Sequence, residues 1–188
     1  MYCFHPASGT IRCVASFDSP AAMPNGLCFS HDGSTLYVTN TACVNAHDRP
    51  GEFSVKSNLG GEIYEYPVIR PAAGTDYSWE GPTLGPRRLF AHCDGGAPDG
   101  IKTDTQGNVY TSTIEGVQVF NKHGALIGKI AIFPDSEPAA FPSDHPDHKI
   151  RHSANLCFLP GGRLLMLAED RIYLARLDPN TVKGSLLP

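Results

Sequence analysis

The chain has 188 residues, enough for one sizeable hydrophobic core, and its 41% hydrophobic and 18% charged residues are typical of a soluble globular protein. Its net charge of -4, without a basic cluster among aromatic residues, argues against nucleic-acid binding, and no apolar stretch reaches the roughly 18 residues of a membrane span. The first residues, MYCFHPASG, lack the basic and apolar segments of a signal peptide, which predicts a cytoplasmic chain unless further sequence precedes Met1.

Short apolar runs separated by turn residues predict an all-β chain. Turns such as His31-Asp32-Gly33 supply the glycine or asparagine that a hairpin needs, and no long stretch has the 3.6-residue period of a helix. Residues 41–61 and 134–149 are polar and are expected to form surface loops. The expected strands, in chain order, are 2–5, 11–16, 26–30, 35–40, 62–68, 87–92, 100–103, 109–113, 116–120, 126–132, 154–158, 163–168 and 171–177.

Part of this pattern repeats. PNGLCFSHDGSTLYVTN, PDGIKTDTQGNVYTST and SANLCFLPGGRLLMLAE each contain a polar residue, an apolar strand, a glycine turn and a second strand, and the polar residues are Asn25, Asp99 and Asn155. Repeats of roughly 40–50 residues with about four strands each are typical of β-propeller blades. The chain is therefore expected to form one partial propeller domain, residues 1–188, with about three and a half blades that begin in the middle of a blade.

Together with MYCFHPASGTIRCVASF, these motifs resemble the C-terminal part of the SMP-30/gluconolactonase family. The resemblance implies a six-bladed β-propeller that holds one divalent metal ion in its central channel and hydrolyses sugar lactones or related esters. It implies that the asparagine of PNG, Asn25, and the aspartate of PDG, Asp99, bind this metal, with Asp99 also orienting or deprotonating the attacking water. Asn155 matches a channel-facing position of the last blade, which makes it a weak candidate for substrate binding; capping of its strand is the alternative.

The physical chemistry of these residues agrees with that implication. The first strand of each blade lines the propeller axis, so a residue at its start projects toward the channel, where amide and carboxylate oxygens suit Ca²⁺, with Zn²⁺, Mg²⁺ or Mn²⁺ possible. The alternative is that PNG and PDG are simply turns.

The resemblance also implies ligands that this chain lacks. The family uses a glutamate near the start of its domain and a further asparagine upstream of PNG, and neither has a counterpart here. The expected metal site is therefore incomplete. The alternative function is a non-catalytic propeller module that binds a partner through its open blade edges, and the same edges predict self-association.

Cysteines and histidines give weaker indications. Since no CxxC pair occurs, free and reduced core residues are expected, with zinc or disulfide roles as the alternatives. The histidines at 145, 148 and 152 have a spacing that would bind zinc from a helix, but nearby prolines favour a polar loop. His92, Cys93 and Asp94 are adjacent on a strand, so their side chains should point to opposite faces rather than form a nucleophilic site. The cysteines are Cys3, Cys13, Cys28, Cys43, Cys93 and Cys157.

Overall fold

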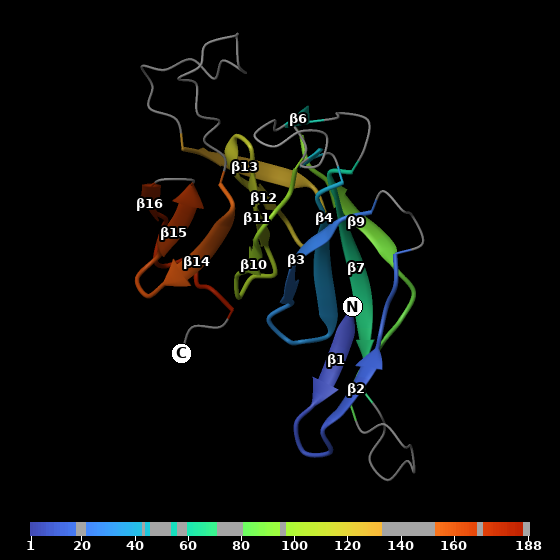
Figure 1. The fold of residues 1–188 in the computed structure, drawn as a ribbon. Helices are drawn as coiled ribbons and strands as arrows, with labels where there is room; N and C mark the ends of the chain where they lie inside the picture. The colour runs from blue at the N-terminus through green and yellow to red at the C-terminus, as the bar shows by residue number, and fades with distance from the viewer. Residues whose placement is uncertain are drawn as a thin grey trace.

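The computed structural model describes residues 1–17, 22–42, 44–45, 54–55, 60–70, 81–94, 97–132, 153–168 and 171–185. Every regular element among these residues is a β-strand, and the strands form antiparallel sheets that stand side by side (Figure 1). The prediction of an all-β fold with propeller blades is confirmed. No described segment is a helix of the length and hydropathy that crossing a membrane requires.

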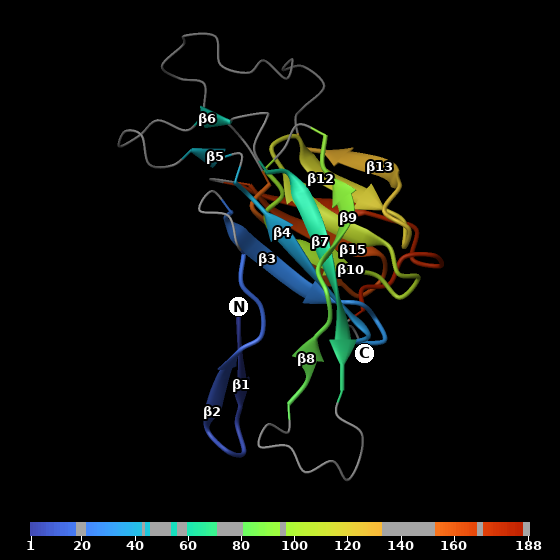
Figure 2. The same cartoon turned by 90° about the vertical axis from the view of Figure 1, so that its right-hand side faces the viewer.

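The chain forms a hairpin followed by successive blades. β1 (Tyr2–His5) and β2 (Thr10–Cys13) make the hairpin, which projects from one end of the molecule (Figure 2). The first blade contains β3 (Pro24–Phe29), β4 (Thr35–Asn40), β7 (Glu62–Ile69), β8 (Thr83–Leu84) and β9 (Arg88–His92). The second contains β10 (Ile101–Thr103), β11 (Val109–Thr113), β12 (Gly116–Phe120) and β13 (Leu126–Ala131). The third contains β14 (Asn155–Leu159), β15 (Arg163–Ala168) and β16 (Arg171–Arg176).

The innermost strands of the blades are β3, β10 and β14. They begin each sheet, and β10 contacts both of the others, so the three lie next to each other where the blades converge. The outer edge of the first blade is one strand in two pieces, because β8 and β9 both pair with β7. Between them the amide of Gly85 donates a hydrogen bond of 2.8 Å to the carbonyl of Pro67.

The predicted strands agree with the observed ones to within one or two residues, apart from residues 11–16, whose strand is Thr10–Cys13. Sequence reasoning missed β5 (Val44–Asn45), β6 (Ser54–Val55) and β8. Each has only two residues, too few to produce an alternating pattern. β5 and β6 pair within the predicted loop 41–61, and the predicted loop 134–149 lies outside the described residues.

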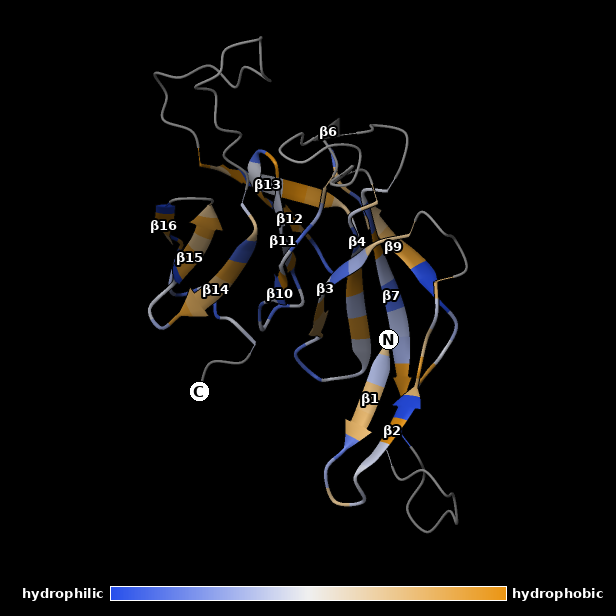
Figure 3. Cartoon of the chain, in the orientation of Figure 1, coloured by the Kyte–Doolittle hydropathy of each residue, from blue (hydrophilic) through white to orange (hydrophobic). Residues whose placement is uncertain are grey.

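Hydrophobic cores fill the seams between the blades. On β4 the side chain of Tyr37 packs toward the second blade, while those of Leu36 and Val38 pack toward the N-terminal segment around Phe17. Alternate residues of one strand thus enter two different cores, as the period of two dictates. A further core joins the second and third blades, and it includes residues of β14 and β15, which Figure 3 shows as largely hydrophobic strands.

The far face of the third blade has no packing partner among the described residues. Leu167, Ile172 and Leu174 are 46%, 67% and 49% exposed there. Self-association through this part of the molecule stays a prediction.

The segment after β16 returns to the second blade. The amide of Thr105 donates to the carbonyl of Lys183 over 2.7 Å, and the amide of Ser185 donates to the carbonyl of Thr103 over 3.0 Å. Asp104 and Gly184 form a β-bridge between these two hydrogen bonds. The turn that joins β10 to β11 is therefore held by residues that follow it by about 80 positions in the chain.

The five described cysteines are free thiols, as predicted, and Cys43 lies outside the described residues. Cys93 is buried, but Cys13 and Cys157 are exposed, so the core prediction is wrong for these two. Both lie on strands with an uncovered face, and a sequence pattern does not report which face of a strand has a neighbour.

Candidate functional site

Asn25, Asp99 and Asn155 lie on neighbouring inner strands, and two glycines set the spacing between those strands. A Cβ atom at Gly26 would overlap the carbonyl oxygen of Asp99, because the β3 backbone lies directly against that peptide group. A Cβ atom at Gly100 would lie 2.8 Å from the Cα atom of Asn155 and would overlap its side-chain oxygen. The structure therefore brings the backbones of all three predicted site residues together.

The close approach explains the glycines of the PNG and PDG motifs. Pro24, Asn25 and Gly26 are the first residues of β3, and neither Gly26 nor Gly100 has a positive φ. These glycines are needed because a neighbouring backbone leaves no room for a side chain, not because a turn requires them. The interpretation of both motifs as simple turns is wrong.

Asn25 lies in a β-bulge. The register of β3 and β4 shifts after Pro24, so that Asn25 and Gly26 together face the single residue Thr39. A bulge of this kind leaves one residue outside the hydrogen-bonded ladder and changes the direction of its side chain. The amide of Gly26 is satisfied instead by the Thr39 hydroxyl, over 2.7 Å.

The second blade repeats the arrangement at Asp99. The carbonyl of Ser112 accepts a hydrogen bond of 2.9 Å from the amide of Asp99, and the Ser112 amide donates one of 2.8 Å to the carbonyl of Gly100. Asp99 and Gly100 thus share one partner residue, as Asn25 and Gly26 share Thr39. Asn25 and Asp99 occupy equivalent places in successive blades.

Asn155 does not occupy that place in the third blade. The amide of Ala154 bonds to the carbonyl of Leu167, and Asn155 also pairs with Leu167. Ala154 is therefore the equivalent of Asn25 and Asp99, whereas Asn155 stands where the other blades have glycine. The sequence pattern predicted Asn155 as the equivalent residue because it is polar, but the register of the strand pair decides which residues are equivalent. The predicted and the observed equivalent residue differ by one position.

The Asn155 side chain lies at the seam between the second and third blades. Its Oδ1 atom accepts a hydrogen bond of 2.8 Å from the amide of Leu156 and lies against Gly100. This contact is the strand cap that was the alternative role for Asn155. The side chain is also exposed, and substrate binding by this residue stays a prediction.

Asn25 and Asp99 offer oxygen donors of the kind that hard divalent cations prefer. Asn25 is exposed, and its side chain makes no hydrogen bond with any residue that the structure describes, so the amide oxygen is available as a neutral donor. Asp99 is half-buried and supplies the carboxylate. Within the described ranges, no group of three or more His, Cys, Asp or Glu side chains gathers as a ligand cluster. The donors that are present fit a hard cation but are few in number.

Comparison with known proteins places this fold. The family described as SMP-30/Gluconolactonase/LRE-like region matches residues 72–142, which contain the PDG motif and the whole second blade. A lactonohydrolase of Aspergillus oryzae, oryL, is 30% identical over 135 residues, or 69% of this chain and 28% of its own length. A gluconolactonase from Xanthomonas campestris superposes with a TM-score of 0.61 and 26% identity, over 94% of this chain and 43% of its own. The chain belongs to the SMP-30/gluconolactonase family.

Family membership confirms the resemblance seen in the motifs. Regucalcin from Agrobacterium tumefaciens, described as a calcium-binding protein, shares the fold, with a TM-score of 0.53 at 19% identity over 88% of this chain and 42% of its own. The chain thus spans roughly a quarter of the lactonohydrolase (28%) and under half of the solved propellers (43% and 42%). What those whole proteins do is therefore carried to this family member only as a proposal.

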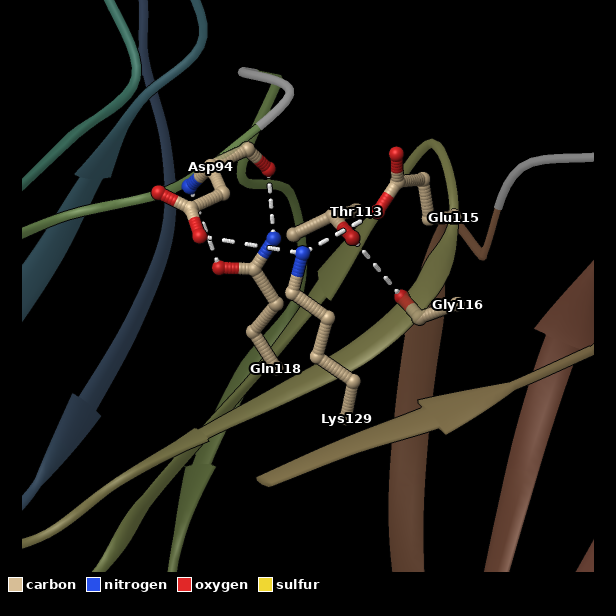
Figure 4. Close-up of polar contacts among 6 residues, drawn as sticks. All are labelled: Asp94, Thr113, Glu115, Gly116, Gln118 and Lys129. Atoms are coloured by element: carbon tan, nitrogen blue, oxygen red, sulfur yellow. Dashed lines mark hydrogen bonds and ion pairs between the residues drawn. The ribbon is translucent and has the colours of Figure 1, made fainter. Parts of the chain in front are cut away.

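In this member of the family, the segment that leads to Asp99 is fastened at both ends. At its outer end, the buried side chain of Gln118 donates a hydrogen bond of 2.5 Å to the carbonyl of Asp94 and accepts one of 3.2 Å from its amide (Figure 4). Lys129 lies 3.2 Å from a carboxylate oxygen of Glu115 and 3.7 Å from one of Asp94. These ion pairs are exposed and contribute little, so the Gln118 amide is the main anchor.

At its inner end, the segment is held by hydroxyl groups of the first blade. The Thr41 hydroxyl donates to the carbonyl of Pro98 over 2.6 Å, and the Thr39 hydroxyl lies 2.9 Å from the carbonyl oxygen of Asp99. Between the anchors, Ala97 is buried and has a φ of 52°, a conformation that costs energy in a residue with a side chain. Sequence reasoning missed these threonines; the hydroxyl residues Thr39 and Ser112 at matching places in the repeat were the available signal.

The remaining predictions concern residues away from this site. His92 and Asp94 are exposed whereas Cys93 is 1% exposed, so adjacent side chains point to opposite faces, as predicted. The histidines at 145, 148 and 152 lie outside the described residues.

Proposed function

We propose that this chain carries part of the active site of a metal-dependent hydrolase of sugar lactones or related esters. The observation that carries the proposal is the equivalence of Asn25 and Asp99: each shares one partner residue with the glycine that follows it, at the start of an inner strand. Similarity to a lactonohydrolase and a gluconolactonase supports the reaction class.

The two donors have separate roles in this proposal. Asn25 contributes a neutral oxygen to the cation, and Asp99 contributes a charged one. A bound divalent ion would polarise the lactone carbonyl and stabilise negative charge that develops on its oxygen. Asp99 orients the attacking water and accepts its proton at a carboxylate oxygen, and Asn155 faces the substrate from the neighbouring strand.

The number of donors sets the expected affinity. Ca²⁺ takes about 6–8 oxygen ligands, and the described residues supply two side chains suited to it. The 188-residue chain is therefore expected to bind the ion weakly and to show little or no hydrolysis of a sugar lactone.

The test compares the parent chain with Asp99→Asn and with Asp178→Asn, which alters an exposed carboxylate in a turn after β16. Ca²⁺ should raise the melting temperature of the parent and of Asp178→Asn. At a free Ca²⁺ concentration of roughly 100 times Kd, binding should add about 2.7 kcal/mol to the free energy of unfolding. Asp99→Asn should lose this shift together with hydrolysis of gluconolactone. If Ca²⁺, Mn²⁺ and Zn²⁺ all left the parent unchanged, or if Asp99→Asn hydrolysed the lactone at the parental rate, the proposal would be wrong.

A second candidate function is favoured by the exposed apolar face of the third blade, formed by Leu167, Ile172 and Leu174. In this alternative the chain is a non-catalytic module that self-associates. Light scattering decides between a monomer and a larger species, and Ile172→Lys should shift a self-associating chain toward the monomer.

A further inference from the structure

One buried side chain contacts both metal-binding motifs. The hydroxyl of Thr39 accepts a hydrogen bond of 2.7 Å from the amide of Gly26, directly after Asn25. The same oxygen lies 2.9 Å from the carbonyl oxygen of Asp99, which is 60 residues further along the chain and belongs to the next blade. Thr39 itself is fully buried, with 0% of its surface exposed.

The direction of these hydrogen bonds follows from the single proton of a hydroxyl group. Because the Thr39 oxygen accepts from Gly26, its own proton is free to be donated. The carbonyl of Asp99 at 2.9 Å is a better acceptor than that of Gly26 at 3.2 Å. The result is a continuous path of hydrogen bonds from the Gly26 amide through Thr39 to the Asp99 carbonyl.

The bulge makes this path necessary. Since Asn25 and Gly26 share one partner residue, the amide of Gly26 has no carbonyl opposite it in β4. A donor left without a partner in a partly buried place is costly, so the side chain at position 39 must supply an acceptor. A hydroxyl does this and, unlike a carbonyl, also donates to the neighbouring blade.

We propose that Thr39 is a positioning residue for the metal site: its hydroxyl fixes the distance between the strand starts that carry Asn25 and Asp99. This inference rests on the proposed function for its chemical meaning. The Thr41 hydroxyl, bonded to the carbonyl of Pro98, reinforces the connection from the same strand end. Together these bonds hold Asp99 beside the first blade despite the strained backbone at Ala97.

The equivalent seam of the second and third blades has a different link. There the Ser112 hydroxyl bonds over 2.9 Å to the hydroxyl of Ser153, and both side chains are fully buried. The third blade offers Ala154 in place of a ligand, and its carbonyl accepts a hydrogen bond of 2.9 Å directly from the amide of Gly100. The direct bond from a side chain to the ligand's own carbonyl is found where both strands carry a predicted ligand.

The experiment uses the whole 188-residue chain labelled with ¹⁵N and titrated with Ca²⁺ by NMR. The test variant is Thr39→Val, which keeps the shape of the side chain and removes the hydroxyl. Thr39→Ser restores the hydroxyl. The matched control is Thr113→Val, because Thr113 is 1% exposed and, among the described residues, its hydroxyl bonds only to the carbonyl of Gly116, on the same blade (Figure 4).

Thr39→Val should weaken the Ca²⁺ affinity by about tenfold, equivalent to about 1.4 kcal/mol. Thr39→Ser and Thr113→Val should stay within about twofold of the parent. The amide of Gly26 should exchange faster with solvent in Thr39→Val than in either of the other variants. A structural role alone would lower overall stability in both valine variants without separating their affinities.

The outcomes distinguish this inference from the proposed function. If the parent binds Ca²⁺ and Thr39→Val binds it equally well, the inference is overturned and the proposed function stands. If the parent binds no metal ion, the proposed function fails, and the exchange rate of the Gly26 amide decides the positional claim by itself. An unchanged rate in Thr39→Val would then overturn it as well.

Discussion

Replacing Gly26 by alanine would place a methyl group against the backbone of the next blade. The new Cβ atom would overlap the Asp99 carbonyl oxygen and lie 3.1 Å from the carbonyl carbon and 3.2 Å from the Cα atom of Gly100. All of these are backbone atoms, so no flexible side chain is able to move aside. Overpacking of this kind lowers the free energy of unfolding by about 1–3 kcal/mol. The alanine also reduces the conformational entropy of the unfolded chain, which stabilises the folded state by about 0.4–1 kcal/mol. We expect a net destabilisation of about 1–2 kcal/mol.

The assay is thermal unfolding, in which each kcal/mol corresponds to about 2–4 °C for a chain of this size, or about 2–8 °C in total. Gly128→Ala is the control, because a Cβ atom at Gly128 would have no heavy atom within 4 Å and its φ is not positive. That variant should be neutral or slightly more stable than the parent. If Gly26→Ala melted as high as Gly128→Ala, the inner strands would not be packed as tightly as described.

Three further predictions concern other buried or titrating groups. Asp104→Asn should lower the free energy of unfolding by about 1–3 kcal/mol, measured in urea. The buried Asp104 carboxylate accepts a hydrogen bond from the side-chain NH2 group of Asn108, and the substitution would place a second NH2 donor against it. An unchanged urea midpoint would refute this. Burial raises the pKa of Cys28 to about 12, so an alkylating reagent at pH 8 should label the exposed Cys157 long before it labels Cys28. Equal rates of labelling would contradict the burial of Cys28. Hydrogen bonds from neighbouring serines lower the pKa of Asp32 to about 2. The contribution of the ionised Asp32 carboxylate to folding stability is therefore fully present above about pH 4 and is lost as the pH falls through 2. The melting temperature of Asp32→Asn should therefore be lower than that of the parent at pH 6 and equal to it near pH 2. A difference in melting temperature that did not change with pH would count against this.

Strand positions were predictable because they depend on local alternation of apolar residues. Residues 109–113 and 163–168 were placed without error, and the shared pattern of PNG and PDG is enough to identify Asn25 and Asp99 as equivalent. Both predictions use information within about twenty residues of chain. The glycines were noticed as well, but as turn residues, since the neighbouring backbone that they accommodate comes from another blade.

The parts of the site that were not predicted depend on pairing between distant residues. The bond from Thr39 to Asp99 spans 60 residues, and nothing in the sequence of either segment names its partner. The one-residue offset at Asn155 arose because LCF follows the asparagine there and the glycine in the first blade. Only the pairing of Asn155 with Leu167 reveals that Asn155 shares a structural position with Gly26 rather than with Asn25.

The return of residues 183–185 to the turn between β10 and β11 has a consequence for biosynthesis. The ribosome must translate about 80 more residues after Thr103 before the segment that pairs with it exists, which takes about 4–16 s at roughly 5–20 residues per second. During that interval the turn lacks the hydrogen bonds that Thr105 and Thr103 make with residues 183 and 185, and the bridge between Asp104 and Gly184 is absent. A pause in translation within this stretch should lengthen the time for which that turn is open to proteases and chaperones, whereas a pause before residue 100 should not.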